Sequence, residues 1–261
     1  MEKRLYVLSR LLLFVGVFTS KLRATSAGRL QAHATFYGGS DATGTMGEGG
    51  SGYGNLYTDG YGTKTAALST ALFSRLCLMM GNPAVVATRL CDASRVPQWC
   101  LKGTSITITA TNFCPPNYTL PSDNGSWCNP PHPHFDLSQP AFQTIAKYKA
   151  GITPIFYRKV GCKRSGGIRF TVNERDYFEL VLISNVGIAG DISNFWIKGS
   201  KTNKWEAMAR NWGANWHSLS YLNGQTLSFR LQTTNGKTRT ALNIVPSTWR
   251  FGQSFTTNLQ F

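Results

Sequence analysis

From about residue 155 to the C-terminus, the chain repeats short strand-like segments that are separated by turn signals. Asn-Gly pairs, which favour tight β-hairpin turns, occur at 223–224 and 235–236. Six or more short strands at this spacing are typical of a β-sandwich of about one hundred residues. We therefore expect a sandwich over residues 155–261. Its predicted strands are residues 168–172, 177–184, 195–198, 205–210, 227–232 and 239–244.

The N-terminal half has a different texture, because many glycines between residues 38 and 62 favour loops over a packed sheet. Residues 65–73 are rich in good helix formers and predict a short helix, and residues 140–148 predict a second one. Residues 104–110 alternate strictly, which predicts a strand whose isoleucines lie on one face. This half is therefore expected to be mainly strands and loops with two short helices.

Residues 1–27 have the features of a secretory signal peptide: a positive start, an apolar stretch too short to span a bilayer, and small residues for cleavage. We expect an exported protein that is soluble or attached to a membrane only peripherally. The first domain is then expected over residues 28–150, with its boundary at about 150–157.

The chain carries a net charge of +15, from 27 Lys and Arg against 12 Asp and Glu. The basic residues are scattered and form no nuclear-type run, so an acidic polysaccharide is a more fitting partner than nucleic acid. Export makes the six cysteines candidates for disulfides, whose pairing the sequence leaves open. No zinc-ligand spacing, nucleotide-binding glycine motif or nucleophile–histidine–acid set is recognisable, so neither a metal nor a cofactor is expected.

Two short motifs carry the most specific chemistry. Residues 134–138 (His-Phe-Asp-Leu-Ser) resemble the acid-bearing segment of glycoside hydrolase family 45 endoglucanases, which cut β-1,4-glucan by inversion. Residues 35–39 (Thr-Phe-Tyr-Gly-Gly) resemble the Thr-x-Tyr-x-Asp motif of the same enzymes. Inverting hydrolysis needs a carboxylic acid and a carboxylate base. The resemblance therefore provides Asp136 as the acid but puts Gly39 where the base should stand.

By this resemblance, Asp136 is the polar centre of a groove, and Thr35 and Tyr37 contact the glucan or support Asp136. Asp41, two residues past the glycine, could in principle replace the missing base. From the residues alone, Asp136 could instead cap the helix that begins nearby, with Ser138 assisting.

A second resemblance rests on a longer set of segments. They are residues 33–41, 52–57, 65–73, 110–117, 166–171 and 210–216. Together they resemble plant α-expansins over about residues 33–255. The resemblance implies a six-stranded double-psi β-barrel followed by an immunoglobulin-like, carbohydrate-binding β-sandwich.

It also implies a secreted, monomeric plant cell-wall protein that binds cellulose and xyloglucan and loosens the wall without hydrolysis. Acidic pectin is a further expected partner. Two alternatives stay open: a weak endoglucanase with Asp136 as acid and Asp41 as base, and an inactive glucan-binding module.

The α-expansin resemblance is interrupted between residues 74 and 90, where the family has a barrel strand with two cysteines. Codons can be chosen for residues 78–89 that encode the family segment when they are read from the third base. We therefore hypothesise that this stretch was read out of frame. Ser51 also replaces a family cysteine, so the first domain is expected to lack up to three cysteines and a core strand, with Cys77 as a stray thiol.

Tryptophans crowd the second half of the chain. Those of a sandwich usually lie in its core, so we expect Trp196, Trp205 and Trp249 to be buried. Residues 211–216, in contrast, combine tryptophan with asparagine and glycine, which is a poor setting for a core. The resemblance implies an exposed aromatic platform that stacks on glucan. Its expected members are Tyr177, Trp212 and Trp216.

Two surface features complete the expectations. Lys198, Lys201 and Lys204 lie near these aromatic residues in the sequence and could hold acidic polymers. Asn117 and Asn124 stand in Asn-x-Ser/Thr sequons on a loop rich in proline, asparagine and glycine, so both are candidates for N-glycosylation.

Overall fold

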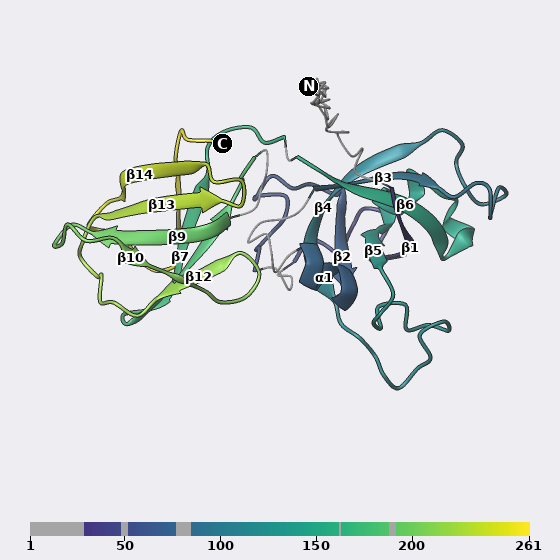
Figure 1. Cartoon of the computed structure of the whole chain (residues 1–261), viewed down its shortest axis with the longest axis horizontal. Helices are drawn as coiled ribbons and strands as arrows, with labels where there is room; N and C mark the ends of the chain where they lie inside the picture. Colours follow the sequence, from purple (N-terminus) through teal and green to yellow (C-terminus); the bar gives the residue numbers. More distant parts are fainter. Residues whose placement is uncertain (1–28, 48–51, 77–84, 162, 188–191) are drawn as a thin grey trace, which may run out of the picture.

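The protein forms two all-β domains that lie side by side in a computed structural model (Figure 1). The predicted signal peptide at 1–27, Ser51 and Cys77 lie outside the described residues. Within those residues, no helix is long and apolar enough to cross a membrane. The structure describes residues 29–47, 52–76, 85–161, 163–187 and 192–261, of which 74–76 and 85–90 are described by their backbone alone.

The first domain is a closed barrel of six strands in the order β1-β5-β2-β4-β3-β6, with β6 paired back onto β1. The β1–β5 and β2–β4 pairs are parallel and the others antiparallel. This architecture confirms the predicted double-psi β-barrel. Its strands are β1 (Leu30–Tyr37), β2 (Thr65–Ser69), β3 (Val85–Cys91), β4 (Ser105–Cys114), β5 (His134–Ser138) and β6 (Thr153–Val160).

The alternating segment at 104–110 is confirmed as part of β4, with Ile106 and Ile108 buried in the barrel core. The predicted helix at 65–73 is wrong in its first half. There the chain forms β2, which is fully buried between β4 on one side and β5 on the other, and only Thr70–Leu76 form the helix α1. Hydrogen bonding to two neighbouring strands outweighs the helix propensity of the alanines, which is a weak preference.

The second predicted helix, over residues 140–148, is also broken. It becomes the short helix α2 (Gln139–Gln143) and the single 3₁₀ turn η1 (Tyr148–Ala150). Ile145 and Ala146 lie between them and pack into the barrel core. Tertiary burial of these two side chains interrupts the helix.

The expected loss of a core strand near residues 74–90 is wrong. β3 pairs with β4 from Val85 opposite Thr109, and with β6 from Val85 opposite Val160, and so closes the barrel. Its sequence is rich in β-branched residues, which favour a strand. Residues 77–84 lie outside the described residues, so the reading-frame hypothesis stays a prediction.

The domain boundary lies later than predicted. β6 belongs to the barrel as far as Val160, so the expected start of the second domain at residue 155 falls inside a barrel strand. Thr153, Ile155 and Tyr157 of this strand are buried, which explains its membership of the first domain. The connection to the sandwich therefore begins after Val160.

The second domain is a sandwich of two sheets, which confirms the predicted architecture. One sheet has the order β10-β9-β13-β14 and the other β11-β12-β8-β7-β15. The sheets enclose a core that contains Phe170, Phe195 and Phe229. The strands are β7 (Arg169–Arg175), β8 (Phe178–Ser184), β9 (Ile192–Gly199), β10 (Glu206–Ala207), β11 (Ala209–Arg210), β12 (Asn215–Ser218), β13 (Leu227–Thr233), β14 (Thr238–Val245) and β15 (Gln253–Thr256).

One predicted strand is divided between the two sheets, and two strands were not predicted. Residues 205–210 form β10 in one sheet and β11 in the other, with the buried Met208 at the crossing point. β12 and β15 are only four residues long and carry polar residues, so alternation over such short runs was not recognisable.

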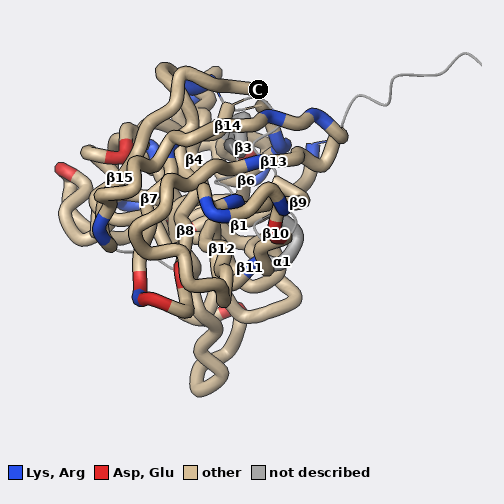
Figure 2. The backbone as a smooth tube through the Cα atoms, turned by 90° about the vertical axis from the view of Figure 1, so that its left-hand side faces the viewer, with Lys and Arg blue, Asp and Glu red and all other residues tan. Residues whose placement is uncertain are grey.

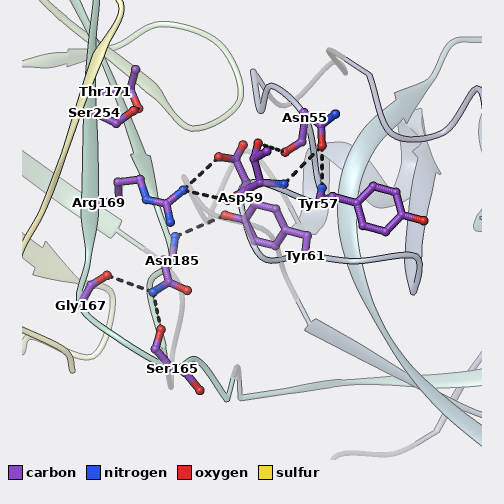
Figure 3. Close-up of polar contacts among 11 residues, drawn as sticks. Asn55, Tyr57, Asp59, Tyr61, Ser165, Gly167, Arg169, Thr171, Asn185 and Ser254 are labelled. Carbon is purple, nitrogen blue, oxygen red and sulfur yellow. Dashed lines mark hydrogen bonds and ion pairs between the residues drawn. The ribbon is translucent and has the colours of Figure 1, made fainter.

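The two domains share a packed junction (Figure 3). Arg169 of β7 forms an ion pair with Asp59 of the first domain at 3.1 Å and a hydrogen bond to the Thr58 carbonyl. The Asn185 amide N–H donates to the Tyr61 hydroxyl at 3.3 Å. Apolar residues of both domains pack beside these contacts. They are Ala42, Met46, Tyr53, Leu56 and Tyr61 from the first domain and Leu182 and Ala214 from the second.

Candidate functional site

The candidate groove is built on the outer face of two neighbouring parallel strands. β1 and β5 are in register, with Thr35 opposite Asp136. Phe135 and Leu137 point into the barrel core, so the alternation of the strand turns Asp136 away from it. On β1, Ala34 is buried and Thr35 and its neighbours of the same parity face outward. Two motifs almost one hundred residues apart therefore meet at one place.

A chain of hydrogen bonds joins three of these side chains. The Thr35 hydroxyl donates to Asp136 Oδ1 at 2.7 Å, and the same oxygen lies 2.8 Å from His134 Nε2. With Asp136 ionised, the single proton of the hydroxyl goes to the carboxylate, so His134 donates from Nε2 in this state. The chain of donors ends on the carboxyl group.

Burial sets the charge state of this chain. It raises the pKa of Asp136 to about 6, although the hydrogen bond from Thr35 acts in the opposite direction. Burial and the neighbouring His33 and His132 lower the pKa of His134 to about 3, so the imidazole is neutral. Asp136 is thus a carboxyl group that carries a proton in mildly acidic solution, which allows it to donate or to accept a hydrogen bond.

The alternative of a helix cap at Asp136 is wrong. Asp136 lies within β5, and α2 begins three residues later with Ser138 in the N-cap position. The Ser138 side chain makes no capping hydrogen bond and instead donates to the Thr63 carbonyl. Asp136 is therefore free of a capping role.

Tyr37 lies in the same groove, two residues along β1 from Thr35. The Asn112 side-chain amide donates to the Tyr37 hydroxyl at 3.5 Å. Burial raises the pKa of Tyr37, and the negative charge of Asp136 adds to this effect, so the phenol stays neutral. The structure thus brings together Thr35, Tyr37 and Asp136, as predicted.

Asp41 is held differently. Its carboxylate accepts a hydrogen bond from the Thr43 amide at 3.0 Å within its own turn, which lowers the pKa of this fully exposed group. The turn also fills the space beside Gly39. A Cβ atom on Gly39 would lie 2.5 Å from the Thr43 hydroxyl and 2.9 Å from Asp41 Oδ1. A side chain at position 39 would therefore require the side chains of Thr43 and Asp41 to shift.

A cavity of about 130 Å³ opens beside Asp136. Thr35, His134 and Asp136 form one wall, and the loop around the Cys114–Cys128 disulfide forms another, with Trp127. Trp127 was not predicted, because the position of its loop beside the groove depends on contacts that are distant in the sequence. Its ring lies 5.9 Å from that of His33.

The cysteines and sequons give one confirmed and one open prediction. Cys91 pairs with Cys100, and Cys114 pairs with Cys128, so disulfides are present as expected. Asn117 and Asn124 are both exposed on the loop between β4 and β5. Glycosylation at these positions stays a prediction.

A row of aromatic residues lies on the outer face of the five-stranded sheet. Tyr177, at the β7–β8 turn, is 68% exposed and lies 5.1 Å from the ring of Tyr221. Phe178 stacks on His217 at 5.3 Å beside them. Trp212, 48% exposed, stands in the loop before β12 near the other end of the same strands. Five residues of β8 separate these ends, or roughly 17 Å at the usual rise of a strand.

Trp212 reaches the first domain at the junction. It lines a cavity of about 290 Å³ together with Asn55 and Asp59 of the barrel and Thr171 and Ser254 of the sandwich. A Cβ atom on Gly52, whose φ is +85°, would lie 2.1 Å from Asn215 Nδ2 and 3.1 Å from the Trp212 ring. The glycine therefore permits the close approach of the two domains at this ring.

Trp216 is not part of this row, contrary to the prediction. It pairs with Val181 and faces the sandwich core, where it is only 4% exposed. Its ring packs edge-on to Phe195 at 5.9 Å, and Arg210 covers it at 4.6 Å. Because β12 was not predicted, the inward direction of this side chain could not be foreseen.

The other three tryptophans of the sandwich also include one that is buried and two that are not. Trp249 is buried as predicted, and its indole N–H donates to the Gln225 carbonyl at 3.0 Å. Trp196 and Trp205 were expected in the core but are only half-buried, on the outer face of the four-stranded sheet. They lie outside the aromatic row.

Comparison with known proteins matches both domains. A family model described as the expansin C-terminal domain matches residues 168–246, and a double-psi barrel model described as lytic transglycolase matches residues 65–157. Expansin-A13 of Oryza sativa subsp. japonica is 57% identical over 90% of this chain and 88% of its own. Expansin-A12 of Arabidopsis thaliana is 48% identical over 92% of this chain and 91% of its own.

Solved structures agree with these relatives on the fold. The crystal structure of an apo expansin of Clavibacter michiganensis superposes with a TM-score of 0.64 and 18% identity, and covers 89% of this chain and 98% of that one. A point mutant of an expansin from the same bacterium, in complex with cellohexaose, has a TM-score of 0.64 and 17% identity over the same shares of the two chains. With close relatives over nearly the whole described chain and both domain models in order, this protein belongs to the α-expansin family.

Proposed function

We propose that this α-expansin is a secreted, non-hydrolytic protein of the plant cell wall that binds cellulose and xyloglucan and disrupts their non-covalent contacts. The observation that carries this proposal is that an acidic residue occupies only one of the two carboxylate positions. Asp136 keeps its place in the groove, whereas position 39 is a glycine, which has no carboxylate, and the Thr43 and Asp41 side chains occupy the space beside it. Inverting hydrolysis needs a group at both positions.

What remains in the groove suits binding. The Asp136 carboxyl, the Thr35 hydroxyl and the Tyr37 phenol offer donors and acceptors on one face, as sugar hydroxyls require. The raised pKa of Asp136 keeps the carboxyl partly protonated in a mildly acidic wall. A glucan held there contributes binding free energy that shifts the equilibrium from glucan–glucan to glucan–protein contacts.

The aromatic row of the sandwich supplies the second contact. Rings that follow one another along a flat sheet offer stacking surfaces to the C–H faces of successive sugars. The exposure of Tyr177 and Trp212 supports their role in this row. The complex of the Clavibacter mutant expansin with cellohexaose supports a β-1,4-glucan as the ligand here. We expect the protein to act as a monomer without a cofactor.

The second candidate function is weak endoglucanase activity with Asp41 as a substitute base. It is weakened by the position of Asp41, whose carboxylate is held by Thr43 in an exposed turn. An inactive glucan-binding module is the remaining alternative, in which the groove binds but does not loosen the wall.

The test applies purified protein to heat-killed, acidified wall strips under constant load, with soluble β-glucan assayed in parallel. We expect extension of the strips without release of reducing ends. Steady release that is lost in Asp41→Asn would establish the endoglucanase instead. Cellulose binding without extension would leave only the inactive module.

A further inference from the structure

We propose that the outer face of the four-stranded sheet binds an acidic polysaccharide whose sugars carry carboxylates, such as a polygalacturonate. This basic face consists of Trp196, Lys198, Trp205 and Arg230, with Lys201 and Lys204 on the adjoining loop. It lies on the other side of the sandwich from the aromatic row. The proposal therefore goes beyond glucan binding and does not depend on it.

Strand alternation fixes the direction of the side chains on this face. Phe195 and Ile197 of β9 are buried in the core, so Trp196 and Lys198 between and after them point outward. Arg230 of β13 lies directly opposite Trp196 in the antiparallel register. The face is therefore built on two central, hydrogen-bonded strands, which hold its side chains in fixed relative positions.

Trp205 holds two cations in place. The Arg230 guanidinium carbon lies 4.3 Å above its ring, and Lys198 Nζ lies 5.4 Å from the ring centre. Cation–π attraction positions these groups but leaves their positive charge and their N–H donors available. A carboxylate that approached Arg230 could form a charge-assisted hydrogen bond, which is stronger than a neutral one.

Few acidic residues lie on the four-stranded sheet, where Glu206 of β10 is the one acidic residue among the described strands. β9, β13 and β14 contain no Asp or Glu, and among the described residues no ion pair neutralises Lys198 or Arg230. Glu206 of β10 is engaged elsewhere, because it accepts hydrogen bonds from Ser218 and Ser220. In Figure 2, Lys and Arg follow the side of β9, β13 and β14.

The chemistry of the face selects among polyanions. Arg230 and Lys198 lie over the Trp205 ring, so this face offers cations rather than open stacking surfaces. Charge-assisted hydrogen bonds to the carboxylates of a polyuronate use these cations directly. Single-stranded nucleic acid binds largely by stacking its bases on open aromatic rings, for which this face is less suitable.

The test measures retention of the full-length protein on immobilised polygalacturonate. The double variant Lys198→Gln, Arg230→Gln is compared with Lys102→Gln, Arg158→Gln, which removes the same charge from exposed positions of the first domain. We expect the first variant to lose about tenfold in affinity, the scale of one charge-assisted hydrogen bond, and the second to bind like wild type. Wild-type binding should weaken with salt, and the fully methyl-esterified polymer should not be retained.

Three outcomes would overturn the proposal: equal losses in the two variants, equal retention of the methyl-esterified polymer, or tighter binding of single-stranded DNA at the same residues. If the first variant does not fold, Lys198→Arg, Arg230→Lys keeps the charges and must retain binding. Trp212→Ala separates this proposal from the proposed function, because it should weaken binding to cellulose and leave binding to polygalacturonate unchanged.

Discussion

The groove of the barrel and the aromatic row of the sandwich are built by different means. In the barrel, parallel pairing of β1 and β5 puts Thr35 next to Asp136, and hydrogen bonds then fix both side chains. In the sandwich, Tyr177 and Trp212 stand on a turn and a loop beside β8, whereas the alternation of β12 turns Trp216 into the core. Trp212 is exposed and Trp216 is buried, although only four residues separate them. The positions of the groove side chains are thus set by their hydrogen-bond partners. The exposure of the rings in the aromatic row is set by the direction in which their backbone turns them.

The largest expected effect is a difference in stability between alanine variants of the two tryptophans. Trp216→Ala should lower the free energy of unfolding by about 3–5 kcal/mol, because it leaves a cavity against Phe195 in the core. Trp212→Ala should lower it by less, because this ring is 48% exposed and only part of it packs at the junction. Urea unfolding of both variants measures the difference. Equal stability of the two would show that Trp216 is not the buried ring.

Binding should respond in the reverse sense. Trp212→Ala should weaken binding to cellulose by roughly 1–3 kcal/mol, the scale measured for stacking on aromatic side chains in nucleic-acid complexes. Trp212→Phe, the matched control, keeps a ring and should keep most of the affinity. Binding isotherms on crystalline cellulose give both values. Unchanged cellulose binding of the alanine variant would show that Trp212 is not part of the glucan-binding aromatic row.

In the groove, a change to one partner should disturb the others. Thr35→Val removes the donor to Asp136 and the acceptor of His134, at a cost of about 1–3 kcal/mol in stability for buried groups left unpaired. It should also raise the pKa of Asp136 above about 6, since the bond from Thr35 lowers it. Thr35→Ser keeps the hydroxyl and is the control. NMR titration of the Asp136 carboxyl carbon measures this pKa. An unchanged pKa of Asp136 in the valine variant would contradict the hydrogen-bond chain.

A further expected effect concerns a buried carboxyl of the sandwich. Burial raises the pKa of Glu179 from its ordinary value near 4.5 to about 7, against a hydrogen bond from the Leu222 amide. A folded-state pKa above the unfolded one means that stability is fully present below pH 4.5 and is lost as the pH rises to about 7. The melting temperature should therefore fall over this range, and less so in Glu179→Gln. A melting curve of this variant with the wild-type pH dependence would exclude Glu179 as the cause.

Much of the fold could be predicted from the sequence. The exceptions are segments whose structure is set by pairing with strands that are distant in the sequence. The strand at 104–110 was recognisable from its own alternation, and so were most strands of the sandwich. Residues 65–69 were not, because pairing with β4 and β5 overrides a helical composition. The boundary was placed too early because β6 follows a helical turn and looks like a linker until its pairing with β1 and β3 is known.

The candidate site shows the same limit. Thr35, Tyr37 and Asp136 were predicted because their motifs are short and specific. Trp127 and the direction of Trp216 were not, since both depend on a loop or a strand whose position is set by distant contacts. A residue can be predicted as polar or aromatic from sequence, but its surroundings come from tertiary structure.

The account depends most on the claim that Asp136 acts in wall loosening without a second carboxylate. The most direct measurement is the extension rate of heat-killed, acidified wall strips with wild type, Asp136→Asn and Asp41→Asn at equal bound protein. We expect Asp136→Asn to abolish extension and Asp41→Asn to retain it, with no reducing ends released by any of them. Full extension by Asp136→Asn, or extension that requires Asp41, would contradict the claim.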